Sequence, residues 1–405
     1  MNSLKKSTKL DNVCYDIRGP VLDEAKRMED AGQKILKLNI GNPAPFGFKA
    51  PDEIVAEIAN NLTKAEGYID SKGLVEAREA VAVYSAKKGM GQIDVENIFI
   101  GNGVSELIVM AMQGLLNNGD EILIPAPDYP LWTAAVVLAG GKPVHYACDE
   151  GSNWYPDISD IKKKISRRTK GIVVINPNNP TGSVYPTDLL NRIIDLAVRH
   201  SLIIYSDEIY DRILYDRASH ASIASLTSDV LCVTLNGLSK SHLITGYRVG
   251  WMTFSGDLSV AQNYLEGVNM LASMRLCSNV PAQYAVSVAL DKDGLIKCHT
   301  ADGGRLKKQR DFGYERINRI PGLSCMKPEG TFYFFPRIDT KKFHIKDDEK
   351  FVLDLLKKEK VLVVQGTGFN WFEPDHFRIV FLPEMETLEK SFDAIENFLK
   401  DYRQE

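Results

Sequence analysis

Short apolar runs alternate with helical patterns through the middle of the chain, and this alternation restricts the possible fold more than any other feature. Predicted strands lie at residues 121–124, 171–175, 202–205 and 230–235, and helical spacing recurs at about 131–139, 187–200 and 257–290. Strands and helices that alternate in this way form a mostly parallel sheet with helices on both faces. We therefore expect an α/β fold.

Each of these four predicted strands is followed by a polar cluster. Tyr129 follows the first strand, Asn179 the second, Asp207 and Tyr210 the third, and Lys240 the fourth. Ligands of parallel sheets bind outside the carboxyl ends of the strands. We expect these side chains to meet at one edge of the sheet, because four such clusters are much less probable by accident than one.

The segment 236–251 contains the residues best suited to covalent cofactor chemistry. Lys240 could form a Schiff base with an aldehyde, and Arg248 could hold a phosphate through two parallel hydrogen bonds. Taken alone, both residues could equally be solvated charges at a strand end. The neighbouring segments favour the functional interpretation.

Two glycine-rich loops could bring backbone amides close to a ligand. The loop 101–105 contains Gly103, Val104 and Ser105 and leads into a predicted helix at 106–116, whose free N–H groups and dipole favour a phosphate. A simple glycine turn is the alternative. A turn-dense loop at 41–47, after a predicted strand at 35–40, begins with Gly41.

The pattern changes after about residue 291, where a charged helix and short strands indicate a smaller α+β unit. A chain of 405 residues is long enough for two domains. We expect an arm at 1–20, a small α+β domain at 21–48 and 291–405, and a large cofactor-binding domain at 49–290.

The composition is that of an ordinary soluble protein, with 44% hydrophobic and 25% charged residues. The net charge of −4 gives no basic footprint for nucleic acid. We expect neither a secretory signal nor a membrane span. The six cysteines are scattered and the seven histidines do not cluster, which predicts reduced thiols in the cytoplasm and no metal site.

Several motifs together resemble the class I aminotransferases, the fold-type-I enzymes that use pyridoxal 5′-phosphate. These motifs are Asn-Pro-Thr-Gly at 179–182, Asp-Glu-Ile-Tyr at 207–210, Ser-Lys at 239–240, Gly-Tyr-Arg at 246–248 and Phe-Arg-Ile at 377–379. The resemblance extends from about residue 13 to the terminal helix. In finer detail, the segments 14–20, 176–182, 236–240 and 271–277 resemble bacterial alanine transaminases.

The resemblance implies roles for the residues at the predicted sheet edge. Lys240 would hold the cofactor through a Schiff base and afterwards move a proton at the substrate's Cα, and Asp207 would keep the pyridine nitrogen protonated. Asn179 and Tyr210 would bind the phenolic oxygen, and Tyr129 would stack on the ring. The implied phosphate ligands are Gly103, Val104, Ser105, Ser239, Arg248 and, from the neighbouring subunit of a homodimer, Tyr68.

The resemblance also implies the substrate contacts and the reaction. Arg378 would clamp the α-carboxylate, helped by Asn179 and the backbone of Gly41. The reaction would be reversible transamination of L-alanine and 2-oxoglutarate to pyruvate and L-glutamate. For the distal carboxylate of glutamate, we expect Arg18 to swing in from the polar arm beside Tyr15, although a surface or interface charge is the alternative for Arg18.

One position departs from the family pattern. Gly237 stands three residues before the lysine, where many relatives have a serine that binds the phosphate, so one phosphate contact is in question. Three other functions share the cofactor residues. These are a transaminase for aspartate, valine or an aromatic amino acid, a lyase that cleaves carbon–sulfur bonds, and a cofactor-sensing regulator, which would need an additional DNA-binding segment.

Overall fold

An eight-stranded sheet forms the centre of the larger part of the molecule. The computed structural model describes residues 4–10, 13, 19–291 and 294–405. Its strands follow the order β2-β9-β8-β7-β6-β3-β4-β5, and the pairs β8–β7, β7–β6, β6–β3 and β3–β4 are parallel. The outer pairs β2–β9, β9–β8 and β4–β5 are antiparallel. These strands are β2 (Ile98–Gly101), β3 (Glu121–Ala126), β4 (Lys142–Asp149), β5 (Tyr155–Pro156), β6 (Thr169–Ile175), β7 (Ile203–Asp207), β8 (Cys232–Gly237) and β9 (Gly250–Ser255).

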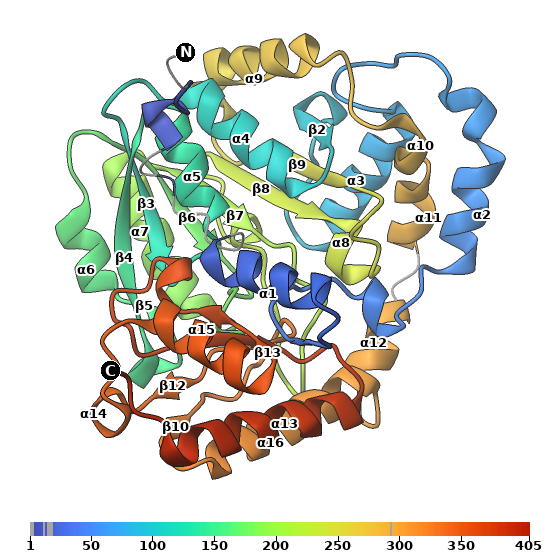
Figure 1. Cartoon of the computed structure of the whole chain (residues 1–405). Helices are drawn as coiled ribbons and strands as arrows, with labels where there is room; N and C mark the ends of the chain where they lie inside the picture. Colours follow the sequence, from blue (N-terminus) through green and yellow to red (C-terminus); the bar gives the residue numbers. More distant parts are fainter. Residues whose placement is uncertain (1–3, 11–12, 14–18, 292–293) are drawn as a thin grey trace.

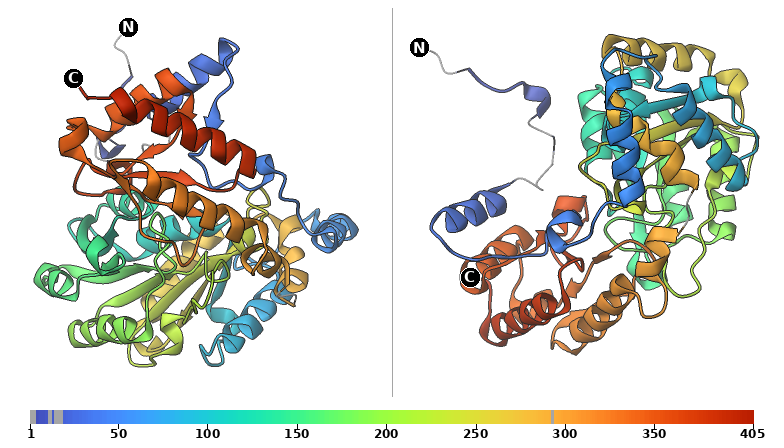
Figure 2. Two further views of the ribbon diagram at one scale, coloured as in Figure 1. Left: turned by 90° about the horizontal axis from the view of Figure 1, so that it is seen from below. Right: turned by 90° about the vertical axis from the view of Figure 1, so that its right-hand side faces the viewer.

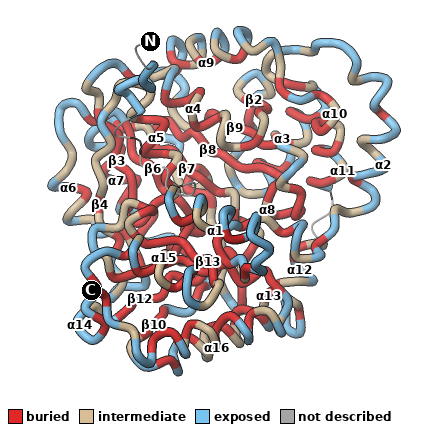
Figure 3. Tube along the Cα trace, in the orientation of Figure 1, coloured by how far each residue is buried: buried red, intermediate tan, exposed pale blue. Residues whose placement is uncertain are grey.

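Helices cover both faces of this sheet (Figure 1). Alternate residues of β6 divide between two hydrophobic clusters, because successive side chains of a strand point to opposite faces. Val173 and Ile175 pack with α4 (Val104–Leu115), α5 (Leu131–Leu138) and α9 (Gln262–Met274). Ile172 and Val174 pack with α6 (Ile158–Lys164) and α7 (Thr187–His200). The central strands β3, β6, β7 and β8 are therefore almost wholly buried, as the red tube in Figure 3 shows, whereas β4 is only partly buried.

A third cluster closes the end of the sheet at β2 and β9. It is formed with α2 (Asp52–Asn60), α3 (Val75–Lys87), α10 (Val280–Gln283) and α11 (Ala285–Asp291). Lys240 lies in α8 (Leu238–Ser241), a single helical turn that follows β8 directly. No helix among the described parts of the chain is long and apolar enough to cross a bilayer.

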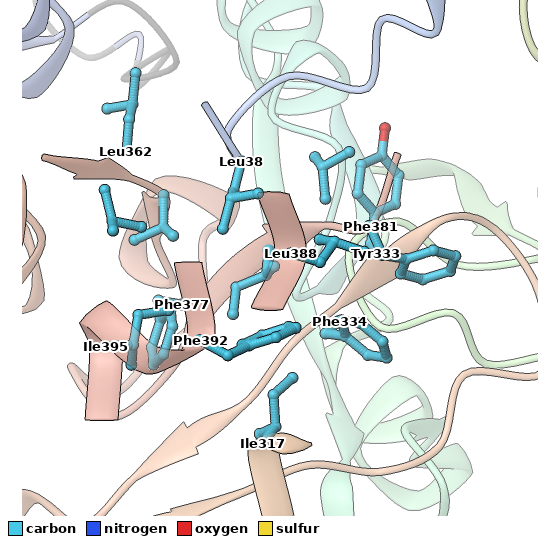
Figure 4. Packing of buried hydrophobic residues seen from close by; sticks show 14 of the residues in the cluster. Leu38, Ile317, Tyr333, Phe334, Leu362, Phe377, Phe381, Leu388, Phe392 and Ile395 are labelled. Carbon is cyan, nitrogen blue, oxygen red and sulfur yellow. The ribbon is translucent and has the colours of Figure 1, made fainter. Parts of the chain in front are cut away.

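The remaining helices and strands surround a further hydrophobic cluster, separate from the three around the eight-stranded sheet. They are α1 (Pro20–Asp30), β1 (Leu36–Lys37), α12 (Gly294–Thr300), α13 (Arg305–Arg319), β10 (Leu323–Ser324), β11 (Tyr333–Phe334), β12 (Arg337–Ile338), α14 (Thr340–Phe343), α15 (Asp348–Glu359), β13 (Val361–Leu362), β14 (Val364–Gln365), β15 (Phe377–Val380) and α16 (Met385–Asp401). Figure 4 shows Leu38 of the N-terminal region in one hydrophobic cluster with Phe377, Leu388 and Phe392 of the C-terminal region. The two ends of the sequence thus build one core, and α1 lies against α15 (Figure 2).

Sequence reasoning located most of these elements but missed some, among them α6, α12, α14 and β12. The single helix expected over 257–290 is divided, because Leu276 has a positive φ of 68° and Pro281 starts a new helix. Strands β4 and β5 were not predicted. The strand expected over 35–40 is only two residues long and pairs with β13. The proposed domain boundaries at 48/49 and 290/291 stay a prediction.

Candidate functional site

A cavity of about 280 Å³ lies at the carboxyl ends of the parallel strands and brings together most of the predicted site residues. The lining includes eleven of them: Gly41, Val104, Ser105, Tyr129, Asn179, Asp207, Tyr210, Ser239, Lys240, Arg248 and Arg378. They come from segments as far apart as the loop after β1 and strand β15. The fold therefore assembles, at one edge, residues that are distant in the sequence.

Lys240 is in an environment that favours its neutral amine. Its Nζ donates a hydrogen bond of 2.7 Å to the carbonyl oxygen of Gly41 and lies 5.6 Å from the centre of the Phe332 ring. Burial, followed by the positive charges of Arg378 and Arg248, lowers the pKa of Lys240 to about 7. At neutral pH a substantial fraction of this amine is unprotonated, which is the form that attacks an aldehyde or accepts a proton.

Asp207 is a buried carboxylate at the end of β7, with 3% of its surface exposed. It accepts hydrogen bonds from the indole Nε1 of Trp132 at 3.2 Å and from the backbone N–H of Ile209 at 3.3 Å. Burial raises the pKa of Asp207 to about 6, although these hydrogen bonds oppose the shift. A cationic ring nitrogen placed beside this carboxylate would stabilise its charged form.

Two tyrosine hydroxyls lie close together in the cavity lining. The hydroxyl of Tyr210 lies 2.7 Å from that of Tyr333, and burial raises the pKa of Tyr210 well above its ordinary value. The amide oxygen of Asn179 accepts a hydrogen bond of 3.0 Å from Arg378 Nη1. Tyr210 and Asn179 therefore both present polar groups to the cavity they line.

The loop between β2 and α4 forms a cradle at the helix N-terminus. Gly103 has a φ of +81°, and a Cβ atom added to it would lie 2.5 Å from Arg248 Nη2. Arg248 donates hydrogen bonds to the carbonyl oxygens of Thr245 and Asn102, at 2.9 and 3.1 Å. Val104 and Ser105 form the first turn of α4 and line the cavity. Free N–H groups and a guanidinium thus point to one place, a combination suited to phosphate.

The glycine at position 237 has a structural explanation. Gly237 pairs with Gly250 of β9, and a Cβ atom at Gly237 would lie 2.6 Å from the carbonyl oxygen of Val249 and 2.9 Å from the Cα of Gly250. A serine would not fit at this backbone position. Ser239, which lines the cavity two residues later, is the available hydroxyl.

Arg378 is a buried arginine on β15, with 3% of its surface exposed. Its Nη2 donates a hydrogen bond of 2.6 Å to the carbonyl oxygen of Asn39. The guanidinium carbon lies 4.4 Å from the centre of the Tyr333 ring and 4.5 Å from that of Phe369. This packing orients a permanently charged fork toward the cavity, where a carboxylate could bind.

Of the other four predicted residues, Gly103 is the N-cap of α4, beside Val104 and Arg248 of the cavity lining. Tyr68 is 81% exposed, and Tyr15 and Arg18 lie outside the described residues. Conversely, sequence reasoning missed Ile40, Ile175, Ile209, Thr245 and Tyr333, which line the cavity, and Trp132, which bonds Asp207. Tyr333 lies in the apolar run 331–335, where nothing in the pattern distinguishes a site residue from a core residue.

The cavity has the groups that pyridoxal 5′-phosphate requires. Lys240 offers a neutral amine to its aldehyde, Asp207 offers a buried carboxylate to its pyridine nitrogen, and the cradle at Gly103 offers N–H groups and Arg248 to its phosphate. These three functions are arranged around one cavity. The residues present therefore fit the cofactor.

Comparisons with known proteins agree with this geometry. A family model described as aminotransferase class I and II matches residues 33–395. The chain is 59% identical to the glutamate–pyruvate aminotransferase AlaA of Escherichia coli (strain K12) over 404 residues, which is 100% of both chains. A crystal structure of an aminotransferase from Escherichia coli superposes with a TM-score of 0.98 at 59% identity and covers 100% of both chains. Alanine aminotransferase from Pyrococcus furiosus superposes with a TM-score of 0.93 at 40% identity, over 98% of this chain and 100% of that one.

The motifs, the cavity and these similarities agree over almost the whole length of the chain. The chain belongs to the class I and II aminotransferases and depends on pyridoxal 5′-phosphate.

Proposed function

We propose that this protein catalyses the reversible transfer of an amino group from L-alanine to 2-oxoglutarate, giving pyruvate and L-glutamate. The observation that carries transamination is the position of Lys240, Asp207 and Arg378 around one cavity. The full-length identity of 59% to a glutamate–pyruvate aminotransferase supports these two substrate pairs. Its substrates are therefore small amino and keto acids.

Each of the three residues has a distinct task. When bound, pyridoxal 5′-phosphate supplies an aldehyde carbon for the amino group and a ring that accepts electrons from the substrate's Cα. Lys240 anchors the cofactor and then moves a proton at that Cα, because its Nζ has a pKa of about 7. Arg378 binds the α-carboxylate of the amino acid, and Asp207 holds the ring nitrogen in its charged form.

Further residues hold the cofactor in place. Gly103, Val104, Ser105, Ser239 and Arg248 bind its phosphate. Tyr210 and Asn179 donate hydrogen bonds to its phenolic oxygen, while Tyr129 packs against the ring. Gly41 supplies backbone beside the substrate. For the distal carboxylate of glutamate, Arg18 next to Tyr15 remains the proposed ligand.

We further propose that the enzyme is a homodimer in which Tyr68 reaches the phosphate of the partner's site. Support comes from large apolar side chains that are exposed in the single chain. Tyr68 is 81% exposed, Met274 78%, Met270 61% and Leu62 52%. Met270 and Met274 lie one turn apart on α9, and exposed apolar side chains that lie together are typical of an interface between chains. The buried free thiols of Cys148, Cys232 and Cys325 agree with a reducing cytoplasm as its location.

The test is the absorption spectrum of the purified holoenzyme. L-alanine alone should convert the bound cofactor to its amine form and release one pyruvate per site, and 2-oxoglutarate should restore the original spectrum. Conversion by aspartate, valine or an aromatic amino acid, but not by alanine, would contradict the substrate assignment. Release of ammonia without any keto acid would instead indicate a lyase.

A further inference from the structure

A buried histidine lies two residues before Arg378, outside the cavity. His376 has 1% of its surface exposed and immediately precedes β15, the strand that bears Arg378. Its ring stacks on Phe335, with centroids 4.8 Å apart and planes at 15°, and the edges of Trp154 and Trp371 enclose it at 5.0 and 5.5 Å. None of the roles proposed above uses this histidine.

Two carboxylates face the two ring nitrogens of His376. Nδ1 lies 2.7 Å from Asp375 Oδ1, and Nε2 lies 3.5 Å from Glu150 Oε1. Arg337 completes the group, with its Nη1 at 3.4 Å from Glu150 and its Nε at 3.2 Å from Asp375. Trp371 Nε1 also donates to Asp375 at 2.8 Å. A protonated imidazole and the guanidinium of Arg337 would together balance the two carboxylates, so that this group would carry no net charge.

The surroundings favour that protonated form. Burial alone would lower the pKa of His376, but the hydrogen bond to Asp375 and the nearby carboxylate of Glu150 raise it above its ordinary value. Burial alone would raise the pKa of Asp375. The hydrogen bond from His376 and the positive charge of its ring outweigh burial, so the pKa of Asp375 is lowered. Each partner therefore stabilises the charge of the other.

The group connects two parts of the molecule. Glu150 follows β4 of the eight-stranded sheet, whereas Arg337, Asp375 and His376 belong to the C-terminal region of β12 and β15. Trp154 of the large sheet region also packs against His376. The residue that immediately precedes β15, His376, is thus held against the large sheet by an ion pair and an aromatic contact.

A continuous series of contacts leads from His376 to Arg378. His376 stacks on Phe335, whose ring meets the Phe369 ring at 6.2 Å, and Phe369 lies against the guanidinium of Arg378 at 4.5 Å. The carbonyl oxygen of His376 also accepts a bond of 2.9 Å from Gly366 N–H, and Gly366 accepts one of 2.9 Å from Phe369 N–H. A shift of His376 would therefore move the surface against which Arg378 packs.

We propose that protonated His376, held between Asp375 and Glu150, is a positioning residue that fastens β15 to the large sheet and so orients Arg378 toward the substrate's α-carboxylate. This inference rests on the proposed function, since it gives Arg378 the role of carboxylate ligand. It assigns His376 no contact with substrate or cofactor. Its effect is on substrate binding, because the α-carboxylate is bound equally in the ground and transition states.

The kinetic test compares His376→Gln, Glu150→Gln and the double variant, each as holoenzyme, with His200→Gln as a control on the exposed end of α7. His376→Gln should raise the KM for both L-alanine and 2-oxoglutarate about tenfold, an effect typical of one coupled buried contact, with kcat within about twofold. Because both single variants lose the same interaction between His376 and Glu150, the double variant should have a KM no higher than that of His376→Gln. Unchanged KM values together with a lower melting temperature would mean a structural role only and overturn the proposal.

Two further readouts separate this inference from its alternatives. In wild type, the KM should rise as the pH increases through the pKa of His376, and His376→Gln should remove that rise. In histidine-labelled protein, the NMR signal that disappears in His376→Gln should titrate above the ordinary pKa of 6.5, and Glu150→Gln should lower its midpoint. A signal that titrates below 6.5 would overturn the proposal. If wild type does not use alanine, the substrate assignment fails, whereas the NMR result still decides the state of His376.

Discussion

Lys240 Nζ donates a hydrogen bond of 2.7 Å to the carbonyl oxygen of Gly41, 199 residues away in the sequence. This contact joins α8, at the end of the large sheet, to the loop after β1. Carbonyl oxygens accept from ammonium and amine alike, so the bond holds the side chain in place without fixing its charge. Burial and two arginines then bring the pKa of Lys240 to about 7.

We predict that the cofactor-free protein takes up pyridoxal 5′-phosphate at a rate that rises with pH and levels off just above pH 7. The reason is that only the neutral amine attacks the aldehyde. Borohydride trapping followed by mass analysis would measure the adduct at Lys240, and Lys240→Met should form none there. A rate that still increased up to pH 10 would show an ordinary lysine.

The same shift predicts a pH-dependent stability of the cofactor-free protein. The unfolded chain keeps the proton on Lys240 up to the ordinary pKa of 10.5, whereas the folded chain releases it near 7. Between these two pH values the unfolded chain binds more protons at Lys240 than the folded chain does. The free energy of unfolding should therefore rise with pH in this interval. Denaturant titrations at pH 7 and pH 9 would measure the free energy of unfolding of wild type and of Lys240→Met. The same change between the two pH values in both proteins would contradict the prediction.

Gly103→Ala should weaken cofactor binding at least about tenfold, because a Cβ atom there would lie 2.5 Å from Arg248 Nη2 and displace the guanidinium. Gly32→Ala is a matched control. Gly32 has nearly the same φ, +80° against +81°, but no atom lies within 4 Å of its added Cβ. Both variants thus carry a similar backbone cost, and fluorescence titration with pyridoxal 5′-phosphate should show a loss only for Gly103→Ala.

Asp207→Asn should lower kcat by about a hundredfold or more, since a neutral amide cannot hold a proton on the cofactor's ring nitrogen. Asp207→Glu retains the charge and should lose less. Steady-state assays with L-alanine and 2-oxoglutarate, at saturating cofactor, would measure both. Equal losses in the two variants would indicate that packing against Trp132, rather than charge, is the important property.

Arg378→Lys should reduce kcat/KM for both substrates by about a hundredfold. A lysine offers a single ammonium in place of the bidentate contact between guanidinium and carboxylate. It also loses the packing of the guanidinium between Tyr333 and Phe369. Arg319→Lys, at an exposed position in the last turn of α13, is the control for the general effect of this exchange. An unchanged kcat/KM in Arg378→Lys would contradict the role of Arg378 as ligand of the α-carboxylate.

A mixing experiment would test the shared site of the proposed dimer. Lys240→Met and Tyr68→Phe place their defects in the same site of a mixed dimer, which leaves its other site intact. Random exchange of subunits should therefore restore activity to about a quarter of wild type, since half of the dimers are mixed and each has one native site. No gain over the Tyr68→Phe dimers alone would contradict the contribution of Tyr68 across subunits.

The sequence by itself determined most strands of the large sheet and its functional edge. Buried parallel strands are continuous apolar runs, and the chain must leave each strand at the same edge, so Tyr129, Asn179, Asp207 and Lys240 could be predicted to meet before any coordinates. The helix α7 has the predicted bounds, 187–200, because its apolar spacing is regular and uninterrupted. Here the local pattern and the tertiary structure agree.

Tertiary structure alone decided which residues complete the site. Trp132 and Tyr333 are aromatic residues in apolar segments, and His376 follows the polar turn 373–375. Only the packing of distant elements places Trp132 and His376 beside a carboxylate and Tyr333 at the cavity. The reason why position 237 must be glycine lies in the close approach of β9. Likewise, the pKa values of Lys240 and Asp207 depend on burial by residues far away in the chain. Local sequence specifies periodicity and turns, whereas burial and charge proximity exist only once the chain is folded.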